Sequence, residues 1–210
     1  PVACHAFISE CTFGLPVFNW QPQSAIIAAI NAWWAENAAE GRVSVIGAYS
    51  LGKAQRILAN VDPIGPILTH GAVEATNRVL RAQGLHLPDT TWAGPEVGLS
   101  PGALVVAPPS ALGTPWASRF GPSAQAFASG WMALRGVRRR RGLSQGFVMS
   151  DHADWRGLNE AIRATGAERV FVTHGYTAPF RRWLQDQGYD AGIVETEYEG
   201  DDAEDIEVIE

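Results

Sequence analysis

The sequence predicts an α/β protein. Short apolar runs alternate with Ala-rich or amphipathic stretches along most of the 210 residues, and this alternation is typical of strands joined by helices. Hydrophobic residues make up 46% and charged residues 18% of the chain. That balance allows a buried core and excludes wholesale disorder. The length fits one or two domains.

Strands are expected where short apolar runs are bounded by turn residues. They fall at residues 2–9, 43–47, 66–69, 103–107, 146–150, 169–173 and 192–196. Helices are expected where apolar residues recur at helical spacing and a Gly or Pro marks an end. They fall at residues 23–39, 53–60, 72–83, 155–164 and 179–187. The Pro-, Gly- and Ser-rich segment 108–122 predicts a functional loop.

Three features bear on where the protein works. No stretch approaches 18 consecutive apolar residues, so we expect no membrane span and no membrane partner. Cys4 and Cys11 cannot form a disulfide framework, which favours a reducing, cytoplasmic location. The chain enters a strand directly after Pro1, without a Met, so we expect that part of a longer protein precedes it.

The charge is distributed unevenly. The net charge is −6, but residues 195–210 hold nine acidic and no basic residues, which leaves 13 acids against 16 bases in residues 1–194. Residues 135–182 contain ten arginines and four acids. A basic region of this kind raises the expectation of a polyanionic partner. The acidic tail itself is interpreted as a solvated terminus.

A glycine-rich turn follows the strand 43–47. From Gly47 to Lys53 it matches the phosphate-binding pattern G-x-x-x-x-G-K-[ST], but Ala54 stands where the pattern requires a hydroxyl that ligates magnesium. A nucleotide-hydrolysing P-loop is therefore disfavoured. A tight strand-to-helix turn is the simpler interpretation, and its backbone could still hold a phosphate of another ligand.

Two histidines follow predicted strands. His152 lies between Asp151 and Asp154, and carboxylates of this kind orient and charge an imidazole. Asp151 could instead be only the N-cap of the next helix. His174 ends the strand 169–173, and Gly175 after it permits close backbone approach. The two histidines are predicted to lie at successive strand ends of one βαβ unit and so to share a sheet edge, where they suit a metal site or general acid–base chemistry.

Two further patterns carry less specific signals. His70 also follows a predicted strand, and we interpret it as part of a helix-entry turn, with substrate contact as the lesser alternative. An arginine-rich run contains Arg135, Arg138, Arg139, Arg140 and Arg141. Such a run is usually a solvated loop, but guanidinium groups bind phosphates and steer polyanions.

Together these motifs carry a resemblance. The chain resembles the second part of a metallo-β-lactamase-fold nuclease with a β-CASP insertion, and the bacterial DNA-ligase-associated exonucleases, relatives of the mRNA 3′-end processing endonuclease and ribonuclease J, are the nearest group. The matching pieces occur in the family's order and span almost the whole chain. They are Phe-Ile-Ser-Glu10-Cys-Thr-Phe-Gly-Leu-Pro, Tyr-Ser-Leu-Gly-Lys53-Ala-Gln, Ser-Gly-Trp-Met, Ser-Asp-His152-Ala-Asp-Trp and Val-Thr-His174-Gly-Tyr.

The resemblance implies roles for individual residues. Glu10 matches the acidic residue that orients the catalytic imidazole, and His152 matches the histidine that contacts the scissile phosphate and assists the leaving group. His174 matches a ligand of one zinc in a two-zinc site. The arginine run would grip the nucleic-acid backbone, with Asp151, Asp154 and Lys53 as possible supporting residues. Residues 1–14 and 146–210 would form the core half, and residues 15–145 the β-CASP domain.

One departure from the family limits what the chain can do alone. The family's His-x-His-x-Asp-His motif, its next metal-binding His and its bridging Asp are absent from these 210 residues. The chain would therefore supply at most one ligand, His174, to the two Zn²⁺ ions and be inactive without the N-terminal half. The remaining core half would leave a sheet face uncovered.

The resulting hypothesis is a zinc-dependent hydrolase that cuts phosphodiester bonds. DNA is the favoured substrate, in repair with an ATP-dependent ligase and a helicase, and this preference rests on the resemblance alone. An RNA-processing endo- or exonuclease of the same fold is one alternative. A nucleic-acid-binding module without catalysis is another.

Overall fold

The computed structural model describes residues 2–98, 100–140 and 145–194, and gives the side chains of all of these except residues 138–140. The chain divides into two compact units. One unit comprises Pro1–Trp20 and His152–Glu210, and the other comprises Gln21–Asp151. The chain passes between the two units twice. The boundaries predicted from the sequence, 14/15 and 145/146, lie a few residues before the observed ones. Both units consist of parallel strands and helices, so the chain is an α/β protein.

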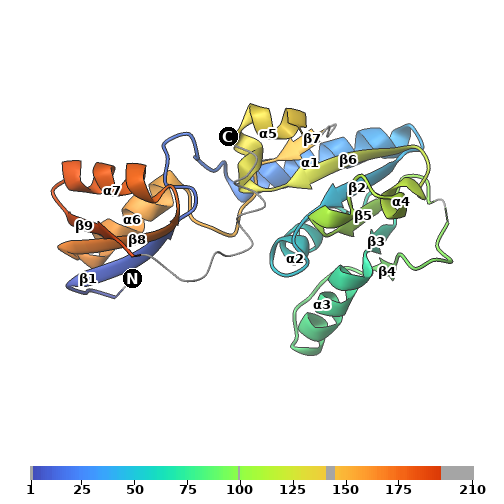
Figure 1. Cartoon of the computed structure of the whole chain (residues 1–210). Coiled ribbons are helices and arrows are strands. Elements are labelled where there is room, and N and C mark those ends of the chain that lie inside the picture. Colours follow the sequence, from blue (N-terminus) through green and yellow to red (C-terminus); the bar gives the residue numbers. More distant parts are fainter. Residues whose placement is uncertain (1, 99, 141–144, 195–210) are drawn as a thin grey trace. The chain divides into compact units, whose positions relative to one another are not determined.

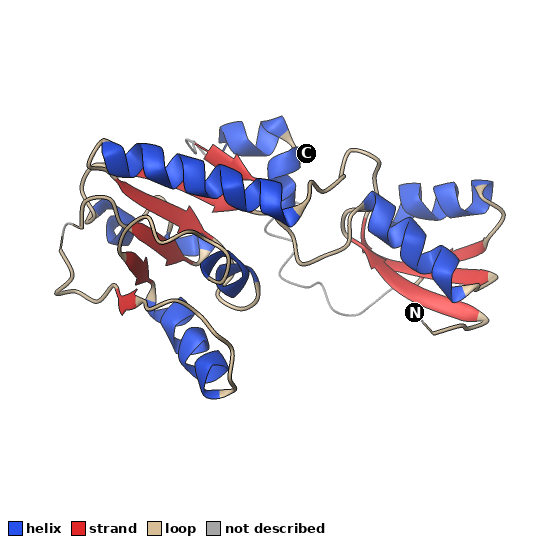
Figure 2. Ribbon diagram, turned by 180° about the vertical axis from the view of Figure 1, so that it is seen from behind, coloured by secondary structure: helices blue, strands red, loops and turns tan. Residues whose placement is uncertain are grey.

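The unit from Gln21 to Asp151 contains a six-stranded parallel sheet in the order β4-β3-β5-β2-β6-β7 (Figures 1 and 2). Its strands are β2 (Val43–Gly47), β3 (Ile67–Thr69), β4 (Thr91–Trp92), β5 (Leu104–Ala107), β6 (Ser123–Ala128) and β7 (Gln145–Phe147). Its helices are α1 (Gln23–Ala39), α2 (Lys53–Leu58), α3 (Gly71–Ala82), α4 (Pro115–Ser118) and α5 (Arg135–Arg140), with short 3-10 turns at Pro109–Ala111 and Gly130–Ala133. The central strands β2 and β5 are buried on both faces, as expected for a parallel sheet covered on both sides.

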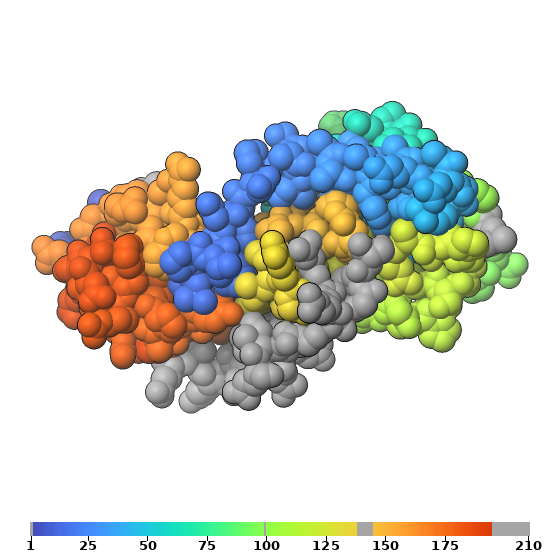
Figure 3. All heavy atoms as spheres, turned by 90° about the horizontal axis from the view of Figure 1, so that it is seen from above, coloured from blue at the N-terminus to red at the C-terminus, as the bar shows by residue number. Residues whose placement is uncertain are grey.

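Alternate residues of these strands enter two different cores. Ile46 and Val106 pack with residues of α1, α2 and α3, whereas Val45 and Val105 pack on the other side with Phe120 and the chain around it. The outer side of α1 lies at the surface, as Figure 3 shows for the blue segment of this unit. α1 and β2 have the bounds that the sequence predicts.

The other unit contains a three-stranded parallel sheet in the order β1-β8-β9. Its strands are β1 (Ala6–Cys11), β8 (Arg169–Gly175) and β9 (Asp190–Ile193), and its helices are α6 (Trp155–Thr165) and α7 (Thr177–Asp186). Both helices lie on the same side of the sheet (Figures 1 and 2). Leu158, Ile162, Phe180 and Leu184 from these helices pack on Val170, Val172 and Ala191.

The opposite face of this small sheet is open to solvent in part. Ile8, Phe171 and Gly192 are register partners on that face, and Ile8 is 61% exposed. The Phe171 ring lies so close to Gly192 that a Cβ there would be 3.0 Å from it. One layer of helices therefore covers one face, while apolar side chains remain accessible on the other.

Several expected elements differ from the structure. The strand β6 was not predicted, because its Ala-rich sequence lacks the β-branched residues that mark strands. The run from Arg135 to Arg140 forms the short helix α5 rather than a loop. The strand expected at 2–9 begins at Ala6, and the one expected at 146–150 ends at Phe147. Arg141, the acidic tail and the end of the strand expected at 192–196 lie outside the described residues.

None of the helices in the described ranges has the length and apolarity that a membrane crossing requires.

Candidate active site

The carboxyl ends of β1 and β8 carry two of the predicted site residues. Glu10 is the register partner of Thr173, and the next pair is Cys11 with Gly175. His174 is therefore the extra residue of a β-bulge. A bulge of this kind interrupts strand pairing and turns a side chain away from its regular direction. Glu10 and His174 thus reach the same edge of the sheet, where sites of parallel sheets collect.

The backbone at this bulge is constrained. His174 has a φ of +56° and is the one non-glycine residue with positive φ in the described part of the chain. Gly175 follows with a φ of +79°, and a Cβ there would lie 2.3 Å from the Cα of Thr12. The sequence-based prediction of a close backbone approach at Gly175 is confirmed. Backbone conformations of this kind cost free energy and persist where the surrounding structure enforces them.

The immediate neighbours of His174 contact its ring and its main chain. The hydroxyl of Thr173 lies 3.0 Å from Nδ1 of His174, so this contact occupies one ring nitrogen. The buried thiol of Cys11 donates to the His174 carbonyl at 3.0 Å. Burial and the charge of Glu10 raise the pKa of the Cys11 thiol to about 12. Cys11 is fully buried, so in this structure its thiol packs beneath the bulge and donates to the His174 main chain.

Glu10 and His152 form a pair in this unit. Nδ1 of His152 lies 3.5 Å from Oε2 of Glu10, and the same oxygen accepts a hydrogen bond from the backbone N–H of Thr12 at 2.7 Å. Burial acts to raise the pKa of Glu10, but the contacts with His152 and Thr12 outweigh it and hold that pKa below its usual range. The pair is accessible, because the His152 side chain is 43% exposed.

The pKa of Glu10 gives a pH-dependent prediction for stability. Because its pKa is lower in the folded than in the unfolded protein, ionised Glu10 stabilises the fold above the unfolded value near 4.5. This stabilisation is lost as the pH falls through the folded pKa. The advantage in unfolding free energy of the wild type over Glu10→Gln should therefore shrink between pH 5 and pH 3. Denaturant unfolding at a series of pH values, followed by amide NMR signals of β8, measures it. If the difference in unfolding free energy between the wild type and Glu10→Gln does not change with pH, the pKa of Glu10 is not lowered in the folded protein.

The structure does not position His152 in the way that the sequence predicted, as part of a βαβ unit with the strand that bears His174. β7, which precedes His152, belongs to the six-stranded sheet, whereas β8 belongs to the three-stranded sheet. The two strands are therefore not one βαβ unit, and the inference from their spacing was wrong. The segment that follows β1 holds His152 instead: the indole N–H of Trp20 donates to the His152 carbonyl at 3.1 Å. The Phe13 ring lies edge-on to the imidazole, with centroids 5.9 Å apart.

The predicted supporting residues Asp151 and Asp154 make structural contacts. Asp154 is the N-cap of α6, because its carboxylate accepts from the N–H of Gly157 at 2.8 Å. The alternative that Asp151 caps this helix is wrong. Asp151 pairs instead with Arg56 at 3.6 Å and with Nζ of Lys53 at 4.0 Å.

Lys53, the third supporting residue, belongs to the glycine-rich turn of the larger unit. Its side chain is 4% exposed and its Nζ lies 4.5 Å from the centre of the Tyr49 ring. The N–H of Gly52 donates to Oε1 of Gln55 at 2.8 Å, and the Gln55 amide donates to the Ser50 carbonyl. Internal hydrogen bonds therefore stabilise this turn, which agrees with the strand-to-helix interpretation.

His70 lies at the start of α3 in the larger unit. Its Nδ1 accepts a hydrogen bond from the N–H of Ala72 at 3.1 Å and so caps the helix. The interpretation of this segment as a helix-entry turn is confirmed.

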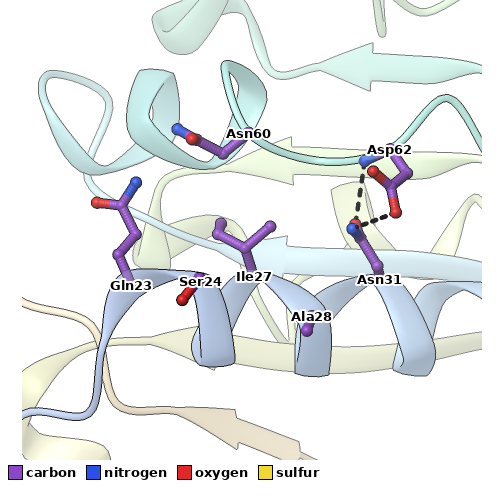
Figure 4. Close-up of a pocket in the computed structure, with 7 residues that line it drawn as sticks. All are labelled: Gln23, Ser24, Ile27, Ala28, Asn31, Asn60 and Asp62. Atoms are coloured by element: carbon purple, nitrogen blue, oxygen red, sulfur yellow. Dashed lines mark hydrogen bonds between the residues drawn. The ribbon is translucent and has the colours of Figure 1, made fainter.

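A surface hollow in the larger unit does not resemble a catalytic site. Its volume is about 470 Å³, and it lies between α1 and the segment that follows α2 (Figure 4). Asn31 and Asp62 bind each other there through two hydrogen bonds, of 2.7 and 3.2 Å. The other lining residues are Gln23, Ser24, Ile27, Ala28 and Asn60. Among the residues that the structure describes, the lining thus includes one carboxylate, which is already hydrogen-bonded, and no histidine, cysteine or lysine.

The described residues do not fit a metal pair on their own. Within residues 2–98, 100–140 and 145–194, no three His, Cys, Asp or Glu side chains come together in a way that could hold a metal ion. Imidazole is a common zinc ligand, so His174 can contribute one donor. The arrangement present in this chain is suited to proton transfer by the Glu10–His152 pair.

Sequence reasoning missed Thr12, Phe13 and Trp20. All three lie between Cys11, the last residue of β1, and the following helix α1. Their position after the carboxyl end of a strand is a signal that could have found them, because loops at that edge build sites in parallel sheets. Their individual contacts depend on the path of the loop, which the sequence pattern does not give.

Comparison with known proteins links the chain to a protein named as a DNA ligase. The chain is 28% identical over 188 residues, 89% of its length, to a protein of Opitutus terrae named "Probable DNA ligase". Those residues make up 18% of the relative, so the chain spans less than a fifth of that protein. No family model matches the chain.

Proposed function

We propose that this chain is part of a metal-dependent nuclease that hydrolyses phosphodiester bonds in DNA. In this proposal it is the second part of a metallo-β-lactamase-fold protein with a β-CASP insertion, and it works as an exonuclease beside a ligase and a helicase. The main support for the proposal is the Glu10–His152 pair, with 3.5 Å between Oε2 and Nδ1, beside the bulge that bears His174.

Two other observations support this proposal. The relative from Opitutus terrae is named a DNA ligase, which favours DNA as the nucleic acid. The exposed apolar face around Ile8 fits a core whose other layer comes from outside the 210 residues.

The pair is suited to one step of phosphodiester hydrolysis. With Nδ1 directed at Glu10, the Nε2 of His152 lies on the opposite side of the ring, and the side chain is exposed enough for a substrate to approach it. A protonated imidazole there can donate its proton to the leaving oxygen as the P–O bond breaks. The Glu10 carboxylate stabilises the charged ring and fixes its orientation.

Metal ions would supply a lowered pKa for the attacking water and would neutralise charge on the phosphate. His174 is the residue of this chain that would bind one of them. The remaining ligands would come from outside the described residues, among which no three His, Cys, Asp or Glu side chains come together in a way that could hold a metal ion.

Zinc content tests the proposal most simply. The chain and a form extended upstream of Pro1 are purified, and their metal is measured. We expect about two zinc ions per extended chain, little in the 210-residue chain, and a lower content in the extended His174→Ala variant. An extended form without bound metal would contradict the hydrolase. Nucleic-acid binding without metal would then favour the non-catalytic module.

The arginines of α5 give a separate prediction about nucleic-acid affinity. Arg135, Arg138, Arg139 and Arg140 lie in a six-residue helix, and Arg141 follows it. If they contact phosphates, substituting them together by Gln should weaken DNA binding and make its salt dependence shallower. The log–log slope should change by roughly 0.9 for each phosphate that an arginine no longer neutralises. Fluorescence anisotropy with a labelled duplex between about 50 and 200 mM salt measures this slope.

Replacing Arg156 and Arg182 by Gln is the matched control. These two arginines are exposed and pair within their own helices, with Glu160 and Asp186. Their replacement should leave the salt-dependence slope of DNA binding nearly unchanged. Equal slopes for all the proteins would exclude the α5 run as the phosphate-binding element.

A further inference from the structure

The loop from Thr12 to Trp20 contacts both members of the Glu10–His152 pair. At its start, the N–H of Thr12 donates to Oε2 of Glu10 at 2.7 Å. At its end, the indole of Trp20 donates to the carbonyl of His152 at 3.1 Å. One loop therefore touches the carboxylate through its backbone and the histidine through a side chain.

The end of this loop is fixed in turn by Asp154. One carboxylate oxygen of Asp154 accepts from the backbone N–H of Trp20 at 2.7 Å, and the other accepts from Gly157 at 2.8 Å. Asp154 is 9% exposed. Hydrogen bonds to an ionised carboxylate are short and strong. The same side chain therefore starts α6 and holds the main chain of Trp20.

A third hydrogen bond and an aromatic cluster complete the attachment. The N–H of Trp155 donates to the carbonyl of Phe18 at 3.1 Å. The Phe13 ring lies edge-on to Phe18, Trp20 and His152, with centroid distances of 4.8, 4.9 and 5.9 Å. The loop is thus joined at several points to the segment that carries His152.

We propose that Trp20 is a positioning residue for His152. Its indole N–H holds the His152 main chain, and Asp154 holds the main chain of Trp20, so that the imidazole stays within reach of Glu10. His152 lies in an exposed segment before α6, outside any strand or helix. This inference rests on the role proposed above for the Glu10–His152 pair.

The Trp20→Phe variant tests this assignment, since it removes the indole N–H and keeps an aromatic ring. In the 210-residue chain, the pKa of Glu10 is measured by NMR of its carboxyl carbon, identified by its loss in Glu10→Gln. His152 is the largest cause that lowers this pKa, so the variant should move it up toward 4.5. In the extended protein, kcat should fall about 10- to 100-fold, because small displacements of a catalytic group have effects of this size.

Trp183→Phe is the matched control. Trp183 also donates its indole N–H, to Asn159 at 2.9 Å, on the helical layer of the same unit. This control should change neither the pKa of Glu10 nor kcat. A folded Trp20→Phe protein with an unchanged Glu10 pKa and unchanged kcat would overturn the assignment.

A measurement on the wild type covers the case in which Trp20→Phe does not fold. The indole N–H signal of Trp20 should shift with pH at the same midpoint as the His152 ring, because the indole is hydrogen-bonded to the main chain of that residue. A Trp20 indole N–H signal that does not shift as the His152 ring titrates would also overturn the proposal. Both NMR readouts are independent of nuclease activity, so a protein that fails to cleave DNA can still show the positioning.

Discussion

Replacing His152 by alanine should lower phosphodiester cleavage by the extended protein about 10²- to 10⁴-fold, the range typical of losing a general acid or base. In the proposed function His152 donates the proton to the leaving oxygen, and alanine cannot do so. The side chain is 43% exposed, so its removal should leave the fold and the metal content unchanged. Single-turnover cleavage of an end-labelled oligonucleotide measures the effect.

The control for this prediction is His70→Asn. His70 caps α3 through Nδ1, and asparagine can also cap a helix. This variant should cleave like the wild type. A His152→Ala protein that keeps full activity would exclude His152 as the proton donor and leave Glu10 without a partner in the reaction.

Gly175→Ala should destabilise the smaller unit by about 2–5 kcal/mol, through backbone strain at positive φ and through steric overlap. The new Cβ would lie 2.3 Å from the Cα of Thr12 and 2.7 Å from the carbonyl oxygen of Cys11. Neither atom can move without shifting the chain that leads into the loop after β1. Chemical denaturation followed by NMR signals of this unit gives the change in unfolding free energy.

Gly166→Ala is the matched comparison, because it separates strain from overlap. Gly166 has a φ of +65°, but among the described residues no atom beyond its immediate chain neighbours lies within 4 Å of its ideal Cβ. It should therefore lose only about 1–2 kcal/mol, the penalty of the left-handed conformation. If both variants lose the same amount, the close approach of Gly175 to Thr12 does not contribute to the destabilisation.

The sequence predicted the regular elements of the α/β fold well where local signals agree with packing. α1 and β2 have the predicted bounds, because apolar periodicity and β-branched residues coincide there with buried positions. The β6 strand went unrecognised because its Ala-rich sequence has weak strand propensity. It forms because it pairs with both β2 and β7, a tertiary context that local pattern cannot reveal.

The sequence predicted some of the residues of the candidate site. It did not predict how the fold brings them together. His152 stands out by type and position, whereas Glu10 was identified through the family resemblance alone, and the structure places the two side chains 3.5 Å apart. The assumed βαβ unit was wrong because β7 and β8 belong to different sheets. A loop after β1 holds His152, and hydrogen bonds such as that from Trp20 depend on a loop path for which no periodicity exists.

The decisive experiment for the proposed nuclease is DNA cleavage by the extended protein. The purified, metal-loaded protein is incubated with an end-labelled DNA oligonucleotide and, in parallel, with RNA of the same sequence. We expect the DNA to be shortened, and His152→Ala to abolish most of this cleavage. Cleavage of RNA alone would reassign the substrate to an RNA-processing role. Intact DNA and RNA, with a protein that is folded and carries two metal ions, would refute the nuclease.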